Sequence, residues 1–512
     1  MPEVEEQVSD SGGSELPTST QSPERLNDLD GRASSGALWT ILGRGSGQVI
    51  RLVSNIILTR LLLPEYFGLM ALVNVFLQGL ALFSDIGIGP ALIQNKREDA
   101  GFVNTVWTTQ AIRGVVLFLI GVALSVPFAA FFEEPLLSSL IQVTALTAAI
   151  QGFTSTSIFT HSRHLHLKRP ALLRVLSQLA ASVAMVACAW VTRSVWSLVL
   201  GGIVGASVEM LLSHVWLPGI RNRFWFERRA ARSLFSFGVW IFLGTVAGFA
   251  AGQADRLILG KLTTMSTLGV YSIALLLASA PVEALSHVSF SVLFPLYSRV
   301  HYSSKNLSEV FSSGRWPVVI LGGWAASGLI GGGPTIVRLL YDARYWEAGW
   351  ILQVLSAGLW VGIVLGGTRS AIVLAVGRSD LTAVMAFSKV LAMVVLVPVG
   401  YLLAGVSGAI AGFALSELVR YSVSAHASAS LGFDERLVDL KLSIRVGIAA
   451  LVSWSAVAWL TELGISSAVL HAIVVFMLAT AFWVRPLSVL VGRLRRGEPL
   501  FMGDGETNDA KV

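Results

Sequence analysis

Charged residues are scarce in this chain. They make up 13% of its 512 residues, whereas hydrophobic residues make up 54%. Soluble proteins carry about 25% charged residues, so the composition excludes a soluble globular protein and indicates a polytopic membrane protein. The single cysteine, Cys188, excludes an internal disulfide and a cysteine-ligated metal site. No nucleotide-binding loop occurs either, which argues against ATP-driven transport.

The apolar segments predict an all-α membrane protein. A membrane helix needs about 20 apolar residues, and by this criterion the sequence contains about fourteen spans. The first six are expected near 37–58, 66–93, 104–130, 136–159, 171–193 and 195–217. The next six are expected near 235–258, 267–294, 316–340, 349–376, 381–403 and 405–428, and the last two near 444–463 and 467–491.

The loop charges predict one orientation. The even-numbered connections carry most of the basic residues, including five arginines between 221 and 232, whereas the opposite side has few. By the positive-inside rule, both termini are cytoplasmic. The net charge of +6 follows from these loops and does not indicate nucleic-acid binding. All loops on the other side are short, which argues against a membrane polysaccharide polymerase, ligase or glycosyltransferase, because such enzymes place catalytic groups on long external loops.

These patterns divide the chain into six parts. We expect a disordered, acidic cytoplasmic tail and a first lobe of six helices, followed by a basic interfacial linker. A second lobe of six helices, two further helices and a cytoplasmic C-terminal tail complete the chain. In the same order, the parts comprise residues 1–35, 36–218, 219–234, 235–430, 431–492 and 493–512.

The first span carries a polar stripe on an apolar helix. Arg44, Gln48, Arg51 and Asn55 return to one face at about 100° per residue. An arginine at the centre of a membrane helix costs roughly 2.5–3.5 kcal/mol on insertion scales. We therefore expect the stripe to face water or a ligand rather than lipid.

An internal repeat relates the two halves. The segment from Leu38 aligns without gaps on the segment from Val239, so that Trp39 matches Trp240 and Gly68 matches Gly269. Six spans separate the copies, so both enter the membrane from the same side. Parallel repeats of this kind are a transporter architecture with the substrate site between the halves.

The segments LTRLLLPEYFGLMAL (58–72), SDIGIGPALIQ (84–94) and RHLHLKRPALLRV (163–175) resemble the polysaccharide transporter family. These are the Wzx-type lipid-linked oligosaccharide flippases of the multidrug/oligosaccharidyl-lipid/polysaccharide exporter superfamily. The resemblance implies a non-enzymatic flippase of the bacterial plasma membrane. Its cargo would be polyprenyl-(pyro)phosphate-linked oligosaccharide units, moved by alternating access for cell-surface polysaccharide export. Implied partners are membrane lipids and the polymerase or glycosyltransferases of the same pathway.

Three other functions stay open. A scaffold in an envelope-assembly complex would have a degenerate transport cavity, and the intact arginine stripe counts against it. An ion-coupled multidrug exporter of the same superfamily would usually have twelve spans and a less cationic cavity. A membrane-embedded polymerase or ligase would need the long external loop that is missing here.

Arginine suits a diphosphate because its fork binds phosphate oxygens in pairs. For each arginine the alternative is an ion pair with a nearby carboxylate or contact with a headgroup.

We expect no cofactor and no metal. His161, His164 and His166 lie in a basic loop without a carboxylate to complete a metal shell, so anionic headgroups or the incoming diphosphate are the better ligands. Titratable groups within a membrane are candidates for coupling to H⁺ or Na⁺. The candidate substrate-binding residues are Arg44, Gln48, Arg51, Asn55, Asn74, Gln78, Arg113, Arg256 and Arg369, and the candidate ion-coupling residues are Asp85, Asp255, Glu283 and His287.

Overall fold

The structure, a computed structural model, describes residues 39, 43, 45–84, 92, 99–164, 166–227, 248–302 and 306–496. Within these ranges every regular element is a helix. The first lobe comprises a helix at 45–61, α2 (Pro64–Phe83), α4 (Ala100–Phe132), α5 (Pro135–Thr144), α6 (Leu146–Gly152), α7 (Ser157–Arg163), α8 (Lys168–Thr192) and α9 (Trp196–Val215). The second lobe comprises a helix at 248–262, α11 (Met265–Val288), η1 (Ser289–Leu293), α12 (Phe294–His301), α13 (Leu307–Leu340), η2 (Ala343–Tyr345), α14 (Ala348–Leu359), η3 (Trp360–Leu365), α15 (Gly366–Ala375) and α16 (Ser379–Ser430). Two further helices, α17 (Arg436–Glu462) and α18 (Ala468–Arg496), follow.

Eleven of the described helices are long and apolar enough to cross a membrane. One of them, α16, is two spans, because Ala404 and Gly405 have non-helical backbone angles in its middle. Gly405 adopts φ +61°, a left-handed conformation that favours glycine. The helices at 45–61 and 248–262 correspond to two more predicted spans. Counted in this way, the described helices follow the order of the fourteen predicted spans, and the predicted all-α polytopic class is confirmed.

Local sequence explains where several helices begin. Proline occupies the first turn of α2 and α5, where its missing N–H leaves no hydrogen bond unmade. The Asp99 carboxylate accepts from the Phe102 N–H and caps α4. In the same way, the Asn306 side chain accepts from the Ser308 N–H at the start of α13. These caps satisfy backbone donors that a helix leaves unpaired at its N-terminus.

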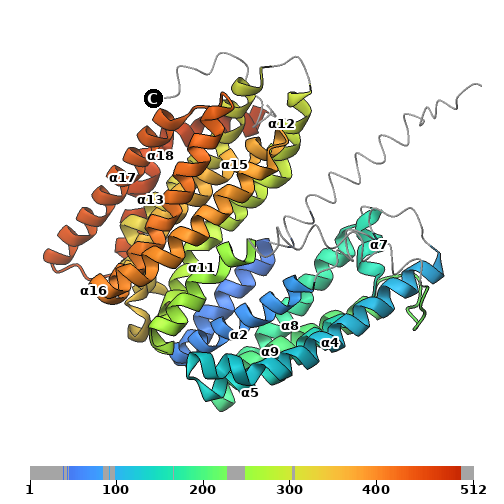
Figure 1. The fold of residues 1–512 in the computed structure, drawn as a ribbon. Coiled ribbons are helices and arrows are strands. Elements are labelled where there is room, and N and C mark those ends of the chain that lie inside the picture. The colour runs from blue at the N-terminus through green and yellow to red at the C-terminus, as the bar shows by residue number, and fades with distance from the viewer. Residues whose placement is uncertain are drawn as a thin grey trace, which may run out of the picture.

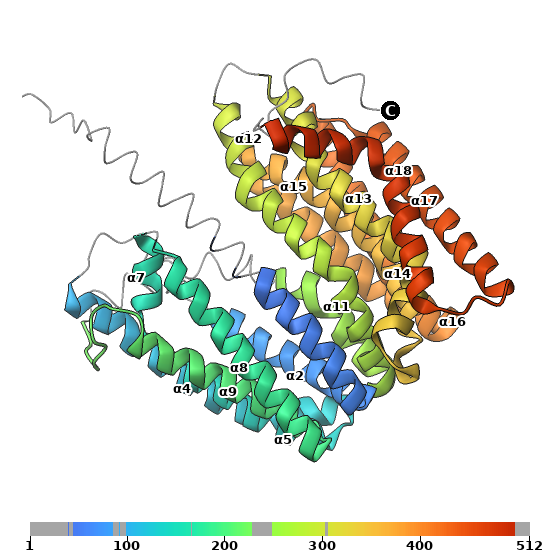
Figure 2. The same cartoon turned by 180° about the vertical axis from the view of Figure 1, so that it is seen from behind.

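The two lobes meet at one end and diverge toward the other, which gives the molecule a V shape (Figures 1 and 2). α2 and α11 lie side by side where the lobes meet. The main hydrophobic core crosses this junction: Leu69 and Leu72 of α2 and Leu268 and Ile273 of α11 are at most 1% exposed. We call the end that carries α7 and α12 the open end, and the end that carries the start of α5 the closed end.

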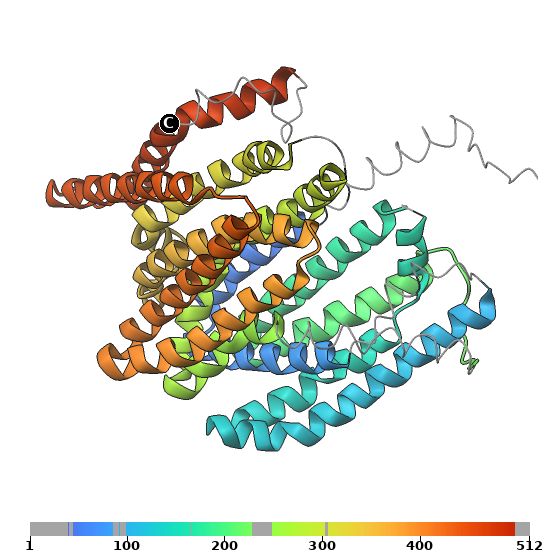
Figure 3. The ribbon, with the colours of Figure 1, turned by 45° about the horizontal axis from the view of Figure 1, so that its top comes forward.

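Helices α17 and α18 pack on α13, on the side of the second lobe that faces away from the first lobe (Figure 3). Trp483 of α18 is completely buried and donates its indole N–H to the Ser327 hydroxyl over 3.1 Å. Gly323 makes room for this ring, because a Cβ at that position would lie 2.5 Å from it. The pair is therefore built into the second lobe by specific packing.

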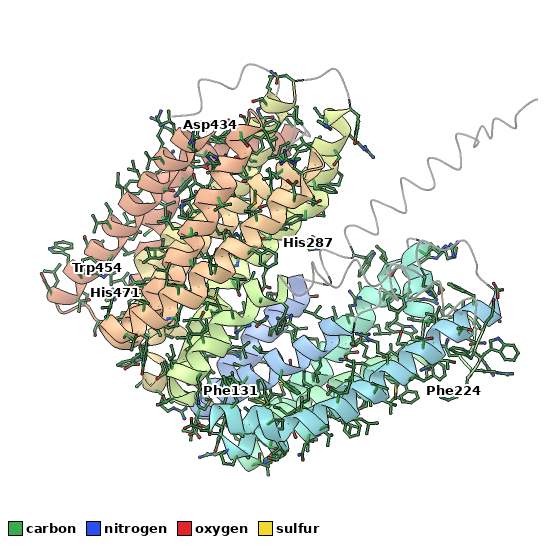
Figure 4. All side chains as sticks on the ribbon, in the orientation of Figure 1. Phe131, Phe224, His287, Asp434, Trp454 and His471 are labelled. Carbon is green, nitrogen blue, oxygen red and sulfur yellow. The ribbon has the colours of Figure 1, made fainter. Side chains whose placement is uncertain are left out.

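Residues 221–227 form an extended strap at the open end of the first lobe. Its backbone N–H groups donate to side chains on the first turns of α4, each over 3.0 Å. The aromatic side chains point outward: Phe224, Trp225 and Phe226 are 60–68% exposed, and Figure 4 places Phe224 at the edge of the molecule. The rest of the predicted interfacial linker, 228–234, lies outside the described residues.

Candidate functional site

The polar stripe predicted on the first span lies opposite an exposed apolar face of the same helix. Three apolar residues spaced four apart, Val49, Val53 and Ile57, are 59%, 51% and 41% exposed and occupy the opposite face of the helix at 45–61. On the stripe's own face, nearer the closed end, Leu58 and Leu62 are buried.

Within the stripe, Arg51 is exposed although its face is turned away from the apolar side of the helix. Gln48 and Asn55 are half-buried, and the Gln48 Nε2 and Asn55 Oδ1 atoms have no hydrogen-bond partner. Unpaired polar atoms at such a position are costly unless water or a ligand satisfies them. Arg44, which completes the predicted stripe, lies outside the described residues.

A chain of polar side chains connects the two lobes. The Gln253 Nε2 donates to the Gln78 Oε1 over 2.8 Å, and Arg256 donates from Nη1 to the Gln253 Oε1. Gln78 belongs to α2, and its predicted neighbour Asn74 is exposed one turn away. Gln78 and Arg256, which are far apart in sequence, are thus both hydrogen-bonded to Gln253, and the bond to Gln78 crosses between the lobes.

A cavity of about 490 Å³ opens beside this chain, on the side of the second lobe. Three of the four predicted ion-coupling residues line it: Asp255, Glu283 and His287. The fourth, Asp85, lies outside the described residues. Arg256 also lines the cavity, and Figure 4 shows His287 on α11 beside the space between the lobes.

Asp255 is the most buried acid of this cavity, at 3% exposure. Its Oδ2 accepts from the Tyr271 hydroxyl over 2.5 Å, whereas its Oδ1 has no hydrogen-bond partner. A half-satisfied carboxylate in a cavity is suited to take a proton or a cation, because either would stabilise the unpaired oxygen.

Lys389 is a cavity residue to which the sequence assigned no role. Its Nζ lies 2.7 Å from the Glu417 carboxylate, and both side chains are almost completely buried. Arg420, one helical turn from Glu417, pairs with the same carboxylate over a longer distance of 3.8 Å and also donates to the Gly362 carbonyl. That carbonyl belongs to the π-helical turn η3, a widening of the helix that often occurs at functional sites.

The expectation that Arg369 lines the cavity is wrong. Its side chain is fully buried and forms a salt bridge of 2.6 Å with Asp439 of α17. Asp439 also pairs with Arg315 of α13 and accepts from the Tyr421 hydroxyl. Two guanidinium groups therefore share one buried carboxylate, and Arg369 fastens α17 to the second lobe.

Arg113 has a local structural role in this conformation. It donates to the Ala81 carbonyl over 2.6 Å and to the Ser84 hydroxyl over 3.0 Å, both at the C-terminal end of α2. A cation at that position satisfies carbonyls that the helix leaves unpaired and complements the helix dipole.

The closed end is held by a crossing of α2 and α11 at two glycines that match in the internal repeat. A Cβ on Gly68 would lie 1.9 Å from the Met265 carbonyl oxygen, and a Cβ on Gly269 would lie 1.8 Å from the Pro64 carbonyl oxygen. Pro64 and Met265 are themselves repeat equivalents. The crossing is therefore symmetric, and no side chain larger than hydrogen fits at either glycine while the helices are this close.

Polar contacts surround this crossing. Lys261, at the end of the helix 248–262, lies 2.6 Å from the Glu133 carboxylate and donates to the Phe131 carbonyl over 2.8 Å; Figure 4 shows Phe131 at the closed end. Contact with Lys261, through a hydrogen bond and its charge, lowers the pKa of Glu133.

The matching contacts on the other side join η2 to the end of the first helix. Arg344 donates to the Thr59 carbonyl over 2.9 Å, and the Tyr345 hydroxyl donates to the Leu62 carbonyl over 3.2 Å. Each lobe thus holds the end of the other lobe's first helix. We call these two sets of contacts the latch.

No group of three or more His, Cys, Asp or Glu suited to hold a metal ion occurs among the residues that the structure describes. His161, His164 and His166 instead line a separate cavity in the first lobe.

The fold is shared with a solved membrane protein. The chain superposes on the lipid II flippase MurJ, in an inward closed conformation, with a TM-score of 0.68 over 88% of this chain and 100% of that chain, at 14% sequence identity. Residues 57–348, more than half of the chain, match the family described as "Polysaccharide biosynthesis protein". The chain therefore belongs to this family, and the predicted Wzx-type resemblance is confirmed.

Two curated relatives show how far the similarity extends. The succinoglycan biosynthesis transport protein ExoT of Rhizobium meliloti (strain 1021) is 26% identical over 275 residues, which are 53% of this chain and 55% of ExoT. The match thus spans about half the length of that relative. The lipopolysaccharide biosynthesis protein WzxC of Escherichia coli (strain K12) is 22% identical over 395 residues, 76% of this chain and 79% of WzxC. The name of ExoT describes a transport protein.

Proposed function

We propose that this protein is a flippase that moves polyprenyl-(pyro)phosphate-linked oligosaccharide units across the bacterial plasma membrane by alternating access, for the biosynthesis of a cell-surface polysaccharide. The open end would face the cytoplasm, with both termini on that side. The names of two relatives refer to the biosynthesis of succinoglycan and lipopolysaccharide, which supports a role in making a cell-surface polysaccharide.

The observation that carries the proposal is the contrast between the two ends of the molecule. At the closed end the lobes are held by the glycine crossing and the latch. Toward the open end, the polar stripe of the helix at 45–61 exposes Arg51. A cargo entering from the open side would therefore meet a cationic, polar surface and would be stopped before the other side.

The chemistry of the cargo suggests which residues bind its diphosphate and which bind its glycan. Arg51, with Gln48 and Asn55 beside it and Arg44 on the same predicted stripe, would bind the diphosphate, because guanidinium groups pair with phosphate oxygens. Asn74, Gln78 and Arg256 would donate to and accept from the hydroxyl groups of the glycan. The isoprenoid chain would stay in the lipid. Arg113 and Arg369 are not part of this set, because both are engaged elsewhere.

Asp255, Glu283 and His287 are the candidates for coupling transport to H⁺ or Na⁺, together with Asp85. Asp255 is the strongest of these, since it is buried and one of its oxygens lacks a partner. Arg256 on the adjacent position links the same cavity to the first lobe through Gln253. Cation binding at Asp255 would therefore be coupled to movement of the lobes through Arg256, Gln253 and Gln78.

The test is the location of the lipid-linked repeat unit in cells that lack the protein. We expect the intermediate to accumulate on the cytoplasmic leaflet, and we expect Arg51→Gln to fail to restore export. Arg378→Gln is the matched control, because Arg378 is an exposed arginine paired with Asp380. A normal distribution of the intermediate between the leaflets in the deletion strain would contradict flippase function.

A further inference from the structure

Two arginines lie where α17 and α18 pack together, a contact that we call the seam. Arg445 of α17 is half-buried, and Arg485 of α18 is exposed. Exposed apolar side chains flank both: Ile444 and Ile448 on α17 are 54% and 49% exposed, and Val484 on α18 is 54% exposed. Because both helices are long and apolar enough to cross a membrane, this apolar surface faces lipid. The two charges therefore lie at the lipid-facing surface of the second lobe.

A proline explains the position of Arg445. Pro486 has no N–H, so the carbonyl of Phe482, four residues earlier, lacks its partner within α18. Arg445 donates to this carbonyl from Nε over 3.1 Å and from Nη2 over 2.7 Å. Its Cζ also lies 5.1 Å from the centre of the buried Trp483 ring. These contacts hold the guanidinium in place and leave Nη1 without an acceptor among the described residues.

Arg485 brings a second positive charge to the same place. It lies one helical turn from Phe482, and its charge acts on that of Arg445. In the part of the chain that the structure describes, the Arg485 side chain has no hydrogen bond or ion pair, and Arg445 has no carboxylate partner. Charged groups within a membrane are costly unless they are paired. Two like charges at a lipid-facing surface therefore indicate an anion that comes from outside the chain.

The bend of α18 places the seam arginines near one face of the membrane. Figures 2 and 3 show that the last part of α18 turns across the open end of the second lobe, and a proline inside a helix causes such a bend. Figure 4 places Asp434, which precedes α17, at the same end. Arg445 lies roughly 14 Å along α17 from its first residue, at about 1.5 Å per residue. A long side chain at that depth reaches the headgroup layer.

We propose that Arg445 and Arg485 bind the phosphate of an anionic phospholipid, such as phosphatidylglycerol, in the leaflet at the open end. Guanidinium groups pair with phosphate oxygens, and basic pockets between membrane helices bind anionic headgroups. Because Arg445 is already held in place, it loses little entropy when the phosphate binds. The flanking residues Ile444, Ile448 and Val484 would contact the acyl chains.

The place of the seam favours a phospholipid over the cargo lipid. The seam belongs to the side of the second lobe that faces away from the first lobe (Figure 3), whereas the proposed cargo would pass between the lobes. Two acyl chains also cover more of the apolar surface beside the arginines than a single prenyl chain does. The site does not depend on flippase function.

The test measures lipid binding to the full-length protein in maltoside micelles, which carry no phosphate. The probe is dioctanoyl phosphatidylglycerol, and dioctanoyl phosphatidylcholine is the neutral comparison. We expect the wild type to prefer phosphatidylglycerol roughly tenfold, and Arg485→Gln to weaken its binding roughly tenfold, as for the loss of a hydrogen bond to a charged group. Arg485→Lys should retain most of the preference, because it keeps the charge. Arg378→Gln is the matched control, since it removes one charge from an exposed ion pair elsewhere.

The melting temperature separates binding from folding. Arg485→Gln should melt at the wild-type temperature without lipid, because its side chain makes no described hydrogen bond or ion pair. Equal phosphatidylglycerol affinity in Arg485→Gln and the wild type would overturn the site, and so would equal affinity of the wild type for the two phospholipids. A short-chain prenyl diphosphate at equal concentration should leave most of the phosphatidylglycerol bound. Its complete displacement would overturn the proposal, because the seam would then select the cargo headgroup. Binding is measured without transport, so a failure of flippase function leaves this result unchanged.

Discussion

The glycine crossing predicts that Gly68→Ala releases the closed end. The added Cβ would lie 1.9 Å from the Met265 carbonyl oxygen, whereas ordinary contact begins at 3.4 Å, so α2 and α11 must separate by about 1.5 Å. Overpacking of this kind costs about 1–3 kcal/mol. Because the clash exists only while the helices touch, the cost falls on the observed conformation alone. The population closed at this end should therefore fall roughly 5- to 150-fold relative to the open one.

The assay is a distance measurement between spin labels at the closed end. The only cysteine, Cys188, is replaced by serine, and labels are placed at Leu136→Cys in α5 and Glu347→Cys beside η2, both exposed positions. Gly68→Ala should add a longer distance to the distribution. Gly202→Ala is the control, since a Cβ there meets no atom within 4 Å. An unchanged distance distribution in Gly68→Ala, together with normal transport, would refute the inference that α2 and α11 touch at these glycines in only one conformation.

Two further predictions concern ion pairs. Asp439→Asn leaves Arg315 and Arg369 buried without their shared charge, so we expect a loss of about 3–5 kcal/mol of stability, measured as a lower melting temperature, whereas Asp434→Asn, in an exposed pair, should change little. The latch should depend on pH: contact with Lys261 holds the pKa of Glu133 below its ordinary value of 4.5, so the contribution is present above 4.5 and is lost as the pH falls through the lowered pKa. The same label pair should report a closed end from pH 8 to 5 and a small rise in the open fraction below that range, because an exposed ion pair contributes little, and Lys261→Gln should remove this dependence.

The spans and the first-helix stripe could be predicted from sequence because they depend on local periodicity. The apolar face of Val49, Val53 and Ile57 and the polar face of Gln48 and Arg51 follow directly from the helical repeat. The internal repeat likewise identified Gly68 and Gly269 as equivalent positions. It did not reveal that they touch, because contact between equivalent positions depends on how the lobes are placed.

The buried ion pairs could not be predicted, because their partners lie on different helices. Arg369 and Asp439 are 70 residues apart, and Lys389 and Glu417 are on the two halves of α16. Glu417 does pair with Arg420, one helical turn away, at 3.8 Å, but Lys389 from the other half of α16 lies closer to the carboxylate, at 2.7 Å. A charged residue in a membrane segment therefore identifies a polar environment without identifying the partner.

Flippase function is tested most directly by reconstitution. The purified protein is placed in vesicles that contain a fluorescent polyprenyl-diphosphate oligosaccharide, and the fraction that becomes accessible to an external quencher is followed over time. We predict rapid exchange between the leaflets with the wild type and with Arg378→Gln, and exchange near the protein-free rate with Arg51→Gln. Equal exchange rates for Arg51→Gln and the wild type would contradict a role of the first-helix stripe in binding the diphosphate, and no exchange with the wild type would contradict flippase function itself.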